Sequence, residues 1–307
     1  MFEATDARIA HPTETPEVSR YATFAGSGAP GGVAGLVTAV AAVAVTVTAL
    51  TSTPTAFASP TVSDLVNQID EANYTRLLDE RLYTRSGDDR GYGPEHDLAR
   101  DNIVEEFNAL GLDVSLHGFP YRGETYYNVQ AVQDGYGRTN EVFIIGAHYD
   151  SVNNPGADDN ASGVAGVIEI ARVLSQYTFE ASIVYIAFDR EEQGLYGSSA
   201  WVNDYRETDI RGMISLDMIA YDPFDRDRAL LYGSSASNPL KDDLADAMLT
   251  YGGIAAFDDG RGDFSDHAPF ERRGFQACLL IEYDVWSNPH YHLQSDTIDT
   301  PNYINYG

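Results

Sequence analysis

From residue 61 onward the chain alternates two hydrophobic patterns. Helical spacing of apolar residues predicts one helix in TVSDLVNQIDEANYTRLLDERL and another in GPEHDLARDNIVEEFNALGL, beginning near Pro94 and ending at Gly111. Runs rich in Val, Ile, Tyr and Phe predict strands: YYNVQAVQ, EVFIIGAHYD, ASIVYIAFD, MISLDMIA, ALLYGS and ACLLIEYD. Three of these runs are apolar without alternation, which is typical of central strands covered on both faces. We therefore predict an α/β fold, a three-layer α/β/α sandwich around a mostly parallel mixed sheet.

The N-terminal segment has a different pattern. Residues 21–63 contain no charged side chain, and residues 33–50 are almost entirely small or apolar. The small-x-small pattern that ends at Ala58 is typical of a signal peptidase site, so we interpret residues 1–58 as a cleaved signal peptide. The alternative is a retained N-terminal membrane anchor through residues 33–50. Either interpretation predicts that residues 59–307, a single domain, are secreted or lie on the extracellular face of the cell membrane.

The charge balance narrows the range of partners. The chain has 47 acidic and 19 basic residues, a net charge of −28, and only one lysine, Lys241. Nucleic acids and anionic lipids are therefore excluded as favourable partners. Because the acids are spread along the whole chain, we expect a strongly hydrated surface and a halophilic source. The single cysteine, Cys278, lies in an apolar run, so we expect a buried structural thiol and no internal disulfide.

Polar residues gather where predicted strands end, which is where ligands bind in open α/β sheets. They are His148 and Asp150 in GAHYDS, Asp158 and Asp159 in GADDN, Glu191 and Glu192 in FDREEQ, and Asp217 in LDMI; His290 and His292 follow in PHYHLQSD. Each alone has an ordinary explanation, such as a helix cap or a solvated acid. Together they form a nitrogen and oxygen ligand set suited to zinc or a similar divalent ion. Two histidines and three carboxylates suffice for two ions, held about 3.5 to 4 Å apart by a shared carboxylate.

Six motifs carry a resemblance to a known family. GAHYDS, GADDNASG, FDREEQGLYGS, LDMI, SDHAPF and YHLQSDT, in this order and at this spacing, resemble the M28 family of zinc exopeptidases, which includes secreted leucine-type aminopeptidases. The resemblance covers about residues 60–307. It implies a three-layer α/β/α catalytic domain over residues 59–307 with two Zn²⁺ ions, acting as an aminopeptidase on extracellular peptides. No protein partner is evident.

The resemblance also implies a role for each matched residue. The metal ligands would be His148, Asp159, Glu192, Asp217 and His292, with Asp159 bridging the two ions and commonly followed by a cis peptide bond. Asp150 would orient His148, and Tyr291 would help to hold the oxyanion of the reaction. Asp266 and His267 of SDHAPF would contact substrate. His290 lies outside the family pattern, and its exchange with His292 as a ligand is the alternative.

The adjacent acids Glu191 and Glu192 would divide two tasks. Neighbouring residues point in different directions, so Glu192 would hold a metal ion while Glu191 reaches the attacking water as general base. The cations would offset the repulsion between the two carboxylates. The resemblance thus implies attack on the peptide carbonyl by a metal-bound hydroxide.

Three functions other than an aminopeptidase are compatible with the resemblance. A carboxypeptidase of the same family is one, because the loops that choose the peptide end cannot be interpreted from the sequence. A glutaminyl cyclase-like transferase shares the fold but uses one zinc ion, whereas five ligands are present here. An inactive receptor-like relative would be expected to have lost ligands or the base, and here the set is complete.

Overall fold

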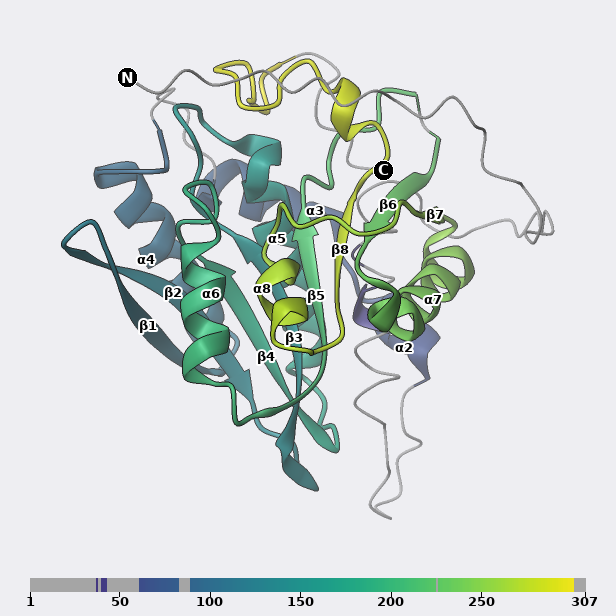
Figure 1. Ribbon diagram of the computed structural model, residues 1–307. Helices are drawn as coiled ribbons and strands as arrows, with labels where there is room; N and C mark the ends of the chain where they lie inside the picture. Colours follow the sequence, from purple (N-terminus) through teal and green to yellow (C-terminus); the bar gives the residue numbers. More distant parts are fainter. Residues whose placement is uncertain (1–36, 38–39, 43–60, 83–88, 225, 301–307) are drawn as a thin grey trace.

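The computed structural model describes residues 37, 40–42, 61–82, 89–224 and 226–300, and its strands form one eight-stranded sheet (Figure 1). The strands are β1 (Asp113–Tyr121), β2 (Glu124–Gln133), β3 (Arg138–His148), β4 (Ala181–Phe188), β5 (Asp209–Asp217), β6 (Arg228–Tyr232), β7 (Ala255–Asp258) and β8 (Ala277–Glu282). Their order across the sheet is β1-β2-β4-β3-β5-β8-β6-β7. The strands β4, β3, β5 and β8 are parallel to their neighbours within this central group, while β2 runs antiparallel to β4 and β6 antiparallel to β8. The sheet is therefore mixed and mostly parallel, as predicted.

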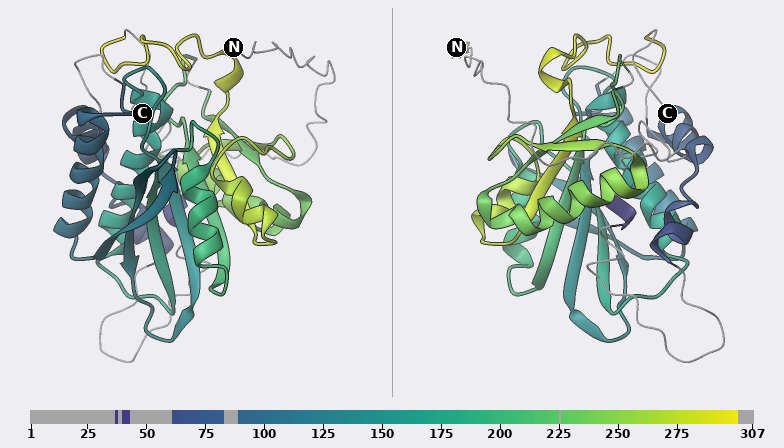
Figure 2. Two further views of the ribbon diagram at one scale, coloured as in Figure 1. Left: turned by 60° about the vertical axis from the view of Figure 1, so that its left-hand side comes forward. Right: turned by 90° about the vertical axis from the view of Figure 1, so that its right-hand side faces the viewer.

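Helices cover both faces of this sheet (Figures 1 and 2). They are α2 (Val62–Val66), α3 (Glu71–Arg76), α4 (Pro94–Ala109), α5 (Gly163–Leu174), α6 (Tyr196–Asp204), α7 (Asn238–Ala247) and α8 (His267–Arg272), with π-helical turns η1 (Leu77–Leu82), η2 (Ala157–Ser162) and η4 (Met248–Gly252) and 3₁₀ turns η3 (Ser235–Ser237) and η5 (Val285–Ser287). The largest core cluster joins α2, α3, α4 and α5 to one face, and a second cluster joins α6 and α8 to the other. This is the predicted three-layer arrangement.

The continuous apolar runs occupy the centre of the sheet. Every residue of β4 and of β8 is buried, as expected for strands with helices on both faces. The edge strand β1 has a largely exposed, alternating pattern instead. Cys278 is buried in β8 and has no disulfide partner, as predicted.

One of the two predicted helices needs adjustment, and the other is confirmed. The segment predicted as one helix over residues 61–82 is broken near Asp70, whose side chain accepts a hydrogen bond from the Ala72 amide and caps a new helix. The predicted helix that begins near Pro94 is confirmed as α4 and ends at Ala109, just before Gly111. The strands β1 and β7 were not predicted.

The predicted signal peptide or anchor over residues 1–58 lies outside the described residues, except for 37 and 40–42. These four side chains are buried in the main core cluster. Among the helices that the structure describes, none combines the length and the apolar character needed to cross a membrane.

Candidate active site

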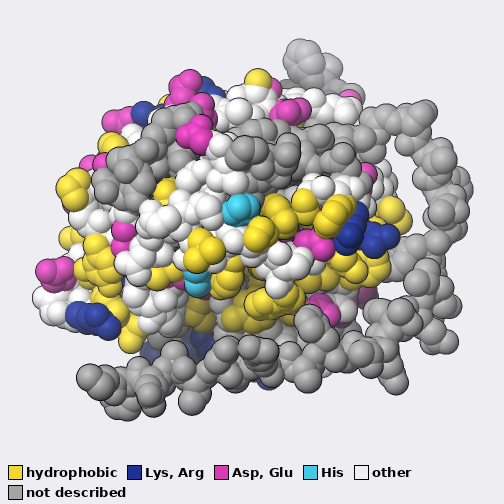
Figure 3. All heavy atoms as spheres, turned by 90° about the horizontal axis from the view of Figure 1, so that it is seen from above, with side chains coloured by type: hydrophobic (Ala, Val, Ile, Leu, Met, Phe, Trp, Pro, Cys, Tyr) yellow, Lys and Arg dark blue, Asp and Glu magenta, His cyan; other side chains and the backbone are white. Residues whose placement is uncertain are grey.

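The predicted ligands come together at the carboxyl edge of the parallel strands. His148 ends β3, Asp217 ends β5, and Glu191 and Glu192 follow β4. Of the remaining two ligands, Asp159 lies in the π-helical turn η2 and His292 in the segment after β8. Figure 3 looks down on this face and shows histidine side chains beside a band of hydrophobic ones. The exposed apolar residues near the end of the chain include Trp286, Tyr291 and Leu293.

The carboxylate of Asp159 connects two groups of ligands. Its Oδ1 lies 3.4 Å from Nε2 of His148, which also lies 3.4 Å from Oδ1 of Asp217. Its Oδ2 lies 3.1 Å from Nε2 of His292, which is 3.1 Å from Oε2 of Glu192. Each oxygen of Asp159 thus faces its own histidine and its own second carboxylate. This is the arrangement that a bridging ligand between two cations requires.

The donor atoms are close enough for metal binding. His148, Asp159 and Glu192 each offer an atom within 4.8 Å of the others, and so do His148, Glu191 and Asp217. Oδ2 of Asp159 and Oε1 of Glu192 are buried and accept no hydrogen bond. Buried carboxylate oxygens without donors are costly unless a cation satisfies them. The residues present therefore fit a divalent metal pair.

Burial and mutual charge shift the pKa values of this cluster when no cation is bound. Burial and the charge of Asp159 raise the pKa of Glu192 to about 8. Burial also raises the pKa of Glu191 well above its usual value, although His148 opposes this. Burial disfavours the charged ring of His148, but the carboxylates of Asp217 and Glu191 outweigh it and raise its pKa. The site thus concentrates protons until cations replace them.

Asp150 is fully buried and supports the site in two ways. Its backbone carbonyl accepts a hydrogen bond from Nδ1 of His148 at 3.1 Å, whereas its carboxylate Oδ1 lies 3.6 Å from the same nitrogen. The carboxylate accepts the backbone N–H groups of Glu191 and Glu192 at 3.1 and 3.4 Å. Asp150 therefore fixes both the histidine ring and the turn that carries the two glutamates.

The two histidines near the end of the chain, His290 and His292, have different neighbours. Nδ1 of His290 pairs with the hydroxyl group of Ser295 at 2.9 Å, whereas Nε2 of His292 lies 3.1 Å from the carboxylates of Asp159 and Glu192. The ring of Tyr291 stacks on that of His292, with centroids 3.8 Å apart. Tyr291 is partly exposed beside the carboxylates.

Asp266 and His267, predicted to contact substrate, are both fully buried. Nε2 of His267 pairs with the carbonyl of Gly262 at 2.6 Å. Burial raises the pKa of Asp266 to about 7, although the charge of His148 opposes this rise. These side chains lie beneath the surface of the site, so any substrate contact would require them to be uncovered.

Two supporting residues were not predicted as functional. Ser265 donates its hydroxyl hydrogen to Oδ2 of Asp217 at 2.8 Å. The carboxylate of Asp296 accepts the backbone N–H groups of Asp158 and Asp159 at 2.8 and 3.1 Å. Both residues lie inside the quoted motifs SDHAPF and YHLQSDT, so their motif membership was the available signal.

The peptide bond between Asp159 and Asn160 is cis, as the resemblance implied.

Comparison with known proteins identifies the family of this chain. The sequence profile of peptidase family M28 matches residues 128–306, so the chain belongs to this family of metallopeptidases. It is 30% identical over 240 residues to the uncharacterized protein YfbL of Escherichia coli, covering 66% of this chain and 73% of that protein. It is 32% identical over 186 residues to leucine aminopeptidase 1 of Arthroderma otae, covering 53% of this chain and 50% of that protein. The chain therefore spans about half the length of such curated leucine aminopeptidases.

Solved structures share the fold. LapA aminopeptidase of Legionella pneumophila aligns with a TM-score of 0.70 at 22% identity, covering 80% of this chain and 69% of that one. A glutaminyl cyclase of Porphyromonas gingivalis gives 0.64 at 21% identity, covering 78% and 93%. These two similarities concern the fold alone. BSAP, a zinc aminopeptidase from Bacillus subtilis, gives 0.52 at 26% identity, covering 61% and 47%.

Proposed function

We propose that this M28 metallopeptidase is an aminopeptidase with two zinc ions, which removes single residues from the amino termini of peptides. The observation that carries the proposal is Asp159, whose two oxygens face separate pairs of ligands. His148 and Asp217 would hold one ion with Asp159, and His292 and Glu192 would hold the other. The names of the aminopeptidase relatives support the reaction class.

The protein side of the reaction follows from the cluster. Bound zinc supplies a Lewis acid for the peptide carbonyl and lowers the pKa of a water molecule. Glu191 would accept the proton of the attacking water and pass it to the leaving amine. Its side chain is buried next to His148 and Asp217, and nearby cations would keep it ionised and ready to accept a proton. Tyr291, beside His292, would donate a hydrogen bond to the developing oxyanion.

The candidate site bears on the alternative functions of a cyclase, a receptor and a carboxypeptidase. Two groups of ligands around Asp159 favour two ions over the single ion of a cyclase. The presence of Glu191 beside a complete ligand set favours catalysis over a receptor role. A carboxypeptidase would use the same centre, and only the products distinguish it. Export from the cell and a high-salt source remain predictions from the sequence.

The deciding experiment incubates the full chain with zinc and a peptide mixture, at low and at high salt, and follows products by mass spectrometry. The peptides are free or blocked at each end. Loss of single residues from free amino termini alone supports the proposal. Trimming at the carboxyl terminus replaces it with the carboxypeptidase function, and ammonia loss from N-terminal glutamine replaces it with cyclase activity. An unchanged mixture with folded, metal-loaded protein contradicts all three.

A further inference from the structure

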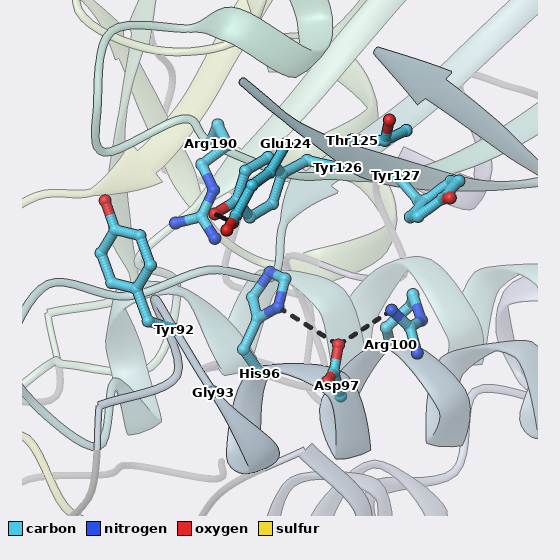
Figure 4. Close-up of a pocket in the computed structure, with 10 residues that line it drawn as sticks. All are labelled: Tyr92, Gly93, His96, Asp97, Arg100, Glu124, Thr125, Tyr126, Tyr127 and Arg190. Carbon is cyan, nitrogen blue, oxygen red and sulfur yellow. Dashed lines mark hydrogen bonds and ion pairs between the residues drawn. The ribbon is translucent and has the colours of Figure 1, made fainter. Parts of the chain in front are cut away.

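A cavity of about 220 Å³ lies at the same edge of the sheet as the candidate metal centre, and Figure 4 shows the residues that line it. It opens between the N-terminal turn of α4 and the beginning of β2. Its lining is Tyr92, Gly93, His96, Asp97, Arg100, Glu124, Thr125, Tyr126, Tyr127 and Arg190. We call it the Arg190 pocket. Arg190 immediately precedes the two glutamates of the active site, so the pocket and the metal centre share one loop.

The guanidinium group of Arg190 has donors that nothing in the described part of the chain accepts. The side chain is fully buried, with its guanidinium carbon 4.2 Å from the ring centroid of Tyr92 and 3.8 Å from that of Tyr126. Nη1 donates to Oε1 of Gln193, but Nε and Nη2 have no hydrogen-bond acceptor. The carboxylate oxygen of Asp189 nearest to Nε is 3.7 Å away. A buried cation with two unused donors is costly unless a ligand supplies an acceptor.

Two other charged side chains of the pocket, Arg100 and Glu124, already have hydrogen-bond partners. Arg100 donates to Asp97 and to Asp101, which occupies its guanidinium group. The carboxylate of Glu124 accepts the hydroxyl hydrogen of Tyr126 at 2.9 Å. Arg190 is thus the cation of the pocket whose donors remain available, and a planar carboxylate matches the fork of its guanidinium group.

The helix α4 adds to the preference for an anion. It has 16 residues, and its N-cap, Gly93, provides no side-chain hydrogen bond. Its first residue, Pro94, has no backbone N–H, and Asp97 donates its own to the carbonyl of Gly93. The backbone N–H groups of Glu95 and His96 and the positive end of the helix dipole therefore favour negative charge at this edge of the sheet, against the acidic side chains of Glu95 and Asp97. Arg190 and the α4 terminus approach the cavity from different elements (Figure 4).

The place of the pocket in the sheet sets its distance from the cleaved bond. It borders β2, while the ligands follow β4, β3 and β5, the next three strands in order. Two or three strand spacings amount to about 10 to 15 Å, and an extended peptide rises about 3.3 Å per residue. An aminopeptidase has only one residue on the amino side of the cleaved bond. A substrate group at this distance therefore belongs to the leaving part, three or four residues along.

We propose that the Arg190 pocket binds a carboxylate of the leaving part of the substrate, either the C-terminal carboxylate of a short peptide or an acidic side chain. This inference rests on the proposed aminopeptidase function. It makes Arg190 a specificity-determining residue that selects short or acidic peptides.

The test compares peptides that differ only in this carboxylate. The zinc-loaded full chain is given Leu-Ala-Ala-Ala as free acid or amide, and Leu-Ala-Ala-Glu-amide or Leu-Ala-Ala-Gln-amide. We expect kcat/KM to favour the carboxylate member of at least one pair about tenfold. The pair that shows the preference identifies the source of the carboxylate. Equal rates within both pairs overturn the proposal.

Variants then assign the preference to Arg190. In Arg190→Gln the ratio within the preferred pair should fall to about one, each rate being normalised to that variant's rate on Leu-p-nitroanilide, which is too short to reach the pocket. Arg190→Lys should keep part of the ratio, and the exposed Arg211→Gln should keep all of it. A ratio that survives in Arg190→Gln overturns the proposal. If no peptide is cleaved, the aminopeptidase function fails, and calorimetric binding of the free-acid and amide peptides to the wild-type protein still decides the inference.

Discussion

The hydroxyl group of Ser265 donates a hydrogen bond to Oδ2 of Asp217 at 2.8 Å, and both side chains are buried. The other oxygen of that carboxylate lies 3.4 Å from Nε2 of His148. Ser265 therefore fixes the rotation at which Asp217 presents Oδ1 to the candidate metal. Groups that orient ligands in this way commonly change metal affinity by about 10- to 100-fold when removed.

Ser265→Ala should therefore weaken zinc binding by about tenfold or more while the protein stays folded. A competition titration against a chelator measures the affinity. Ser237→Ala is the matched control, because Ser237 is equally buried and donates to Glu271 at 2.6 Å, outside the ligand cluster. This control should lose stability but keep its zinc affinity. Unchanged affinity in Ser265→Ala contradicts the orienting role.

Glu191→Gln and Glu192→Gln should separate catalysis from metal binding. The first should retain both ions and lose turnover by about 10² to 10⁴-fold, because the amide cannot accept a proton. The second should lose metal, since Glu192 lies 3.1 Å from His292 in the group that would hold one ion. Metal content by mass spectrometry and peptide cleavage rates are measured on the same samples. Substantial turnover in Glu191→Gln would refute the base assignment.

The metal-free protein should become less stable as pH rises from about 5 to 8. Burial raises the pKa of Asp266 to about 7 and that of Glu192 to about 8, so both stabilise the fold fully near pH 4 and lose this contribution as pH rises through those values. Burial disfavours the charged ring of His292, but the carboxylates of Asp159 and Glu192, each 3.1 Å from its Nε2, raise its pKa to about 10. Its contribution also declines above its unfolded pKa of 6.5. All three contributions have the same sign.

Zinc should reverse this trend, because metal binding requires deprotonated ligands and stabilises only the folded state. Melting temperatures at about pH 5 and 8, with chelator and with excess zinc, test both signs. Asp266→Asn should reduce the pH dependence in chelator, since it removes one of the titrating groups. A metal-free protein that is more stable at pH 8 than at pH 5 would contradict the prediction that these buried groups are protonated in the folded state.

The long apolar runs made most of the fold predictable. The strands β1 and β7 were missed for different reasons. The sequence of β1, DVSLHGFPY, mixes polar residues, glycine and proline because an edge strand has one exposed face, and β7 has only four residues. The break near Asp70 was hidden because apolar residues continue with helical spacing on both sides of it.

The ligand motifs could be recognised in the sequence because each is contiguous. The hydrogen bonds that orient the ligands could not, because they join residues far apart in the chain. Ser265 reaches a carboxylate 48 residues away, and Asp296 holds the amide of Asp158 across 138 residues. The sequence around Arg190 does not indicate a binding role. Its unused donors become evident only in the folded structure, where Tyr92 and Tyr126 pack against the guanidinium group. Contacts of this range depend on tertiary packing, which one sequence does not specify.

Gly163 allows a close approach between the segments that carry the ligands Asp159 and Asp217. A Cβ atom there would lie 2.3 Å from Oδ1 of Asn160 and 2.7 Å from the carbonyl oxygen of Leu216, next to Asp159 and Asp217. Asn160 links the two segments, because its amide group donates to Leu216 O and its Oδ1 accepts the Gly163 N–H. Gly163→Ala should therefore cost about 1 to 3 kcal/mol of stability and weaken zinc binding, since backbone must move.

Gly166→Ala on the same helix is the matched control. A Cβ atom there would meet the ends of the Ile219 and Leu216 side chains at 3.2 Å, and flexible side chains can shift by a few tenths of an ångström. The gain in helix propensity of up to about 1 kcal/mol offsets this contact. Denaturant unfolding and zinc titration of both variants decide the matter. Equal stability and zinc affinity in the two variants would mean that the Asn160 contact does not fix the positions of Asp159 and Asp217. A loss of both in Gly163→Ala alone would mean that the metal site depends on the close approach at this glycine.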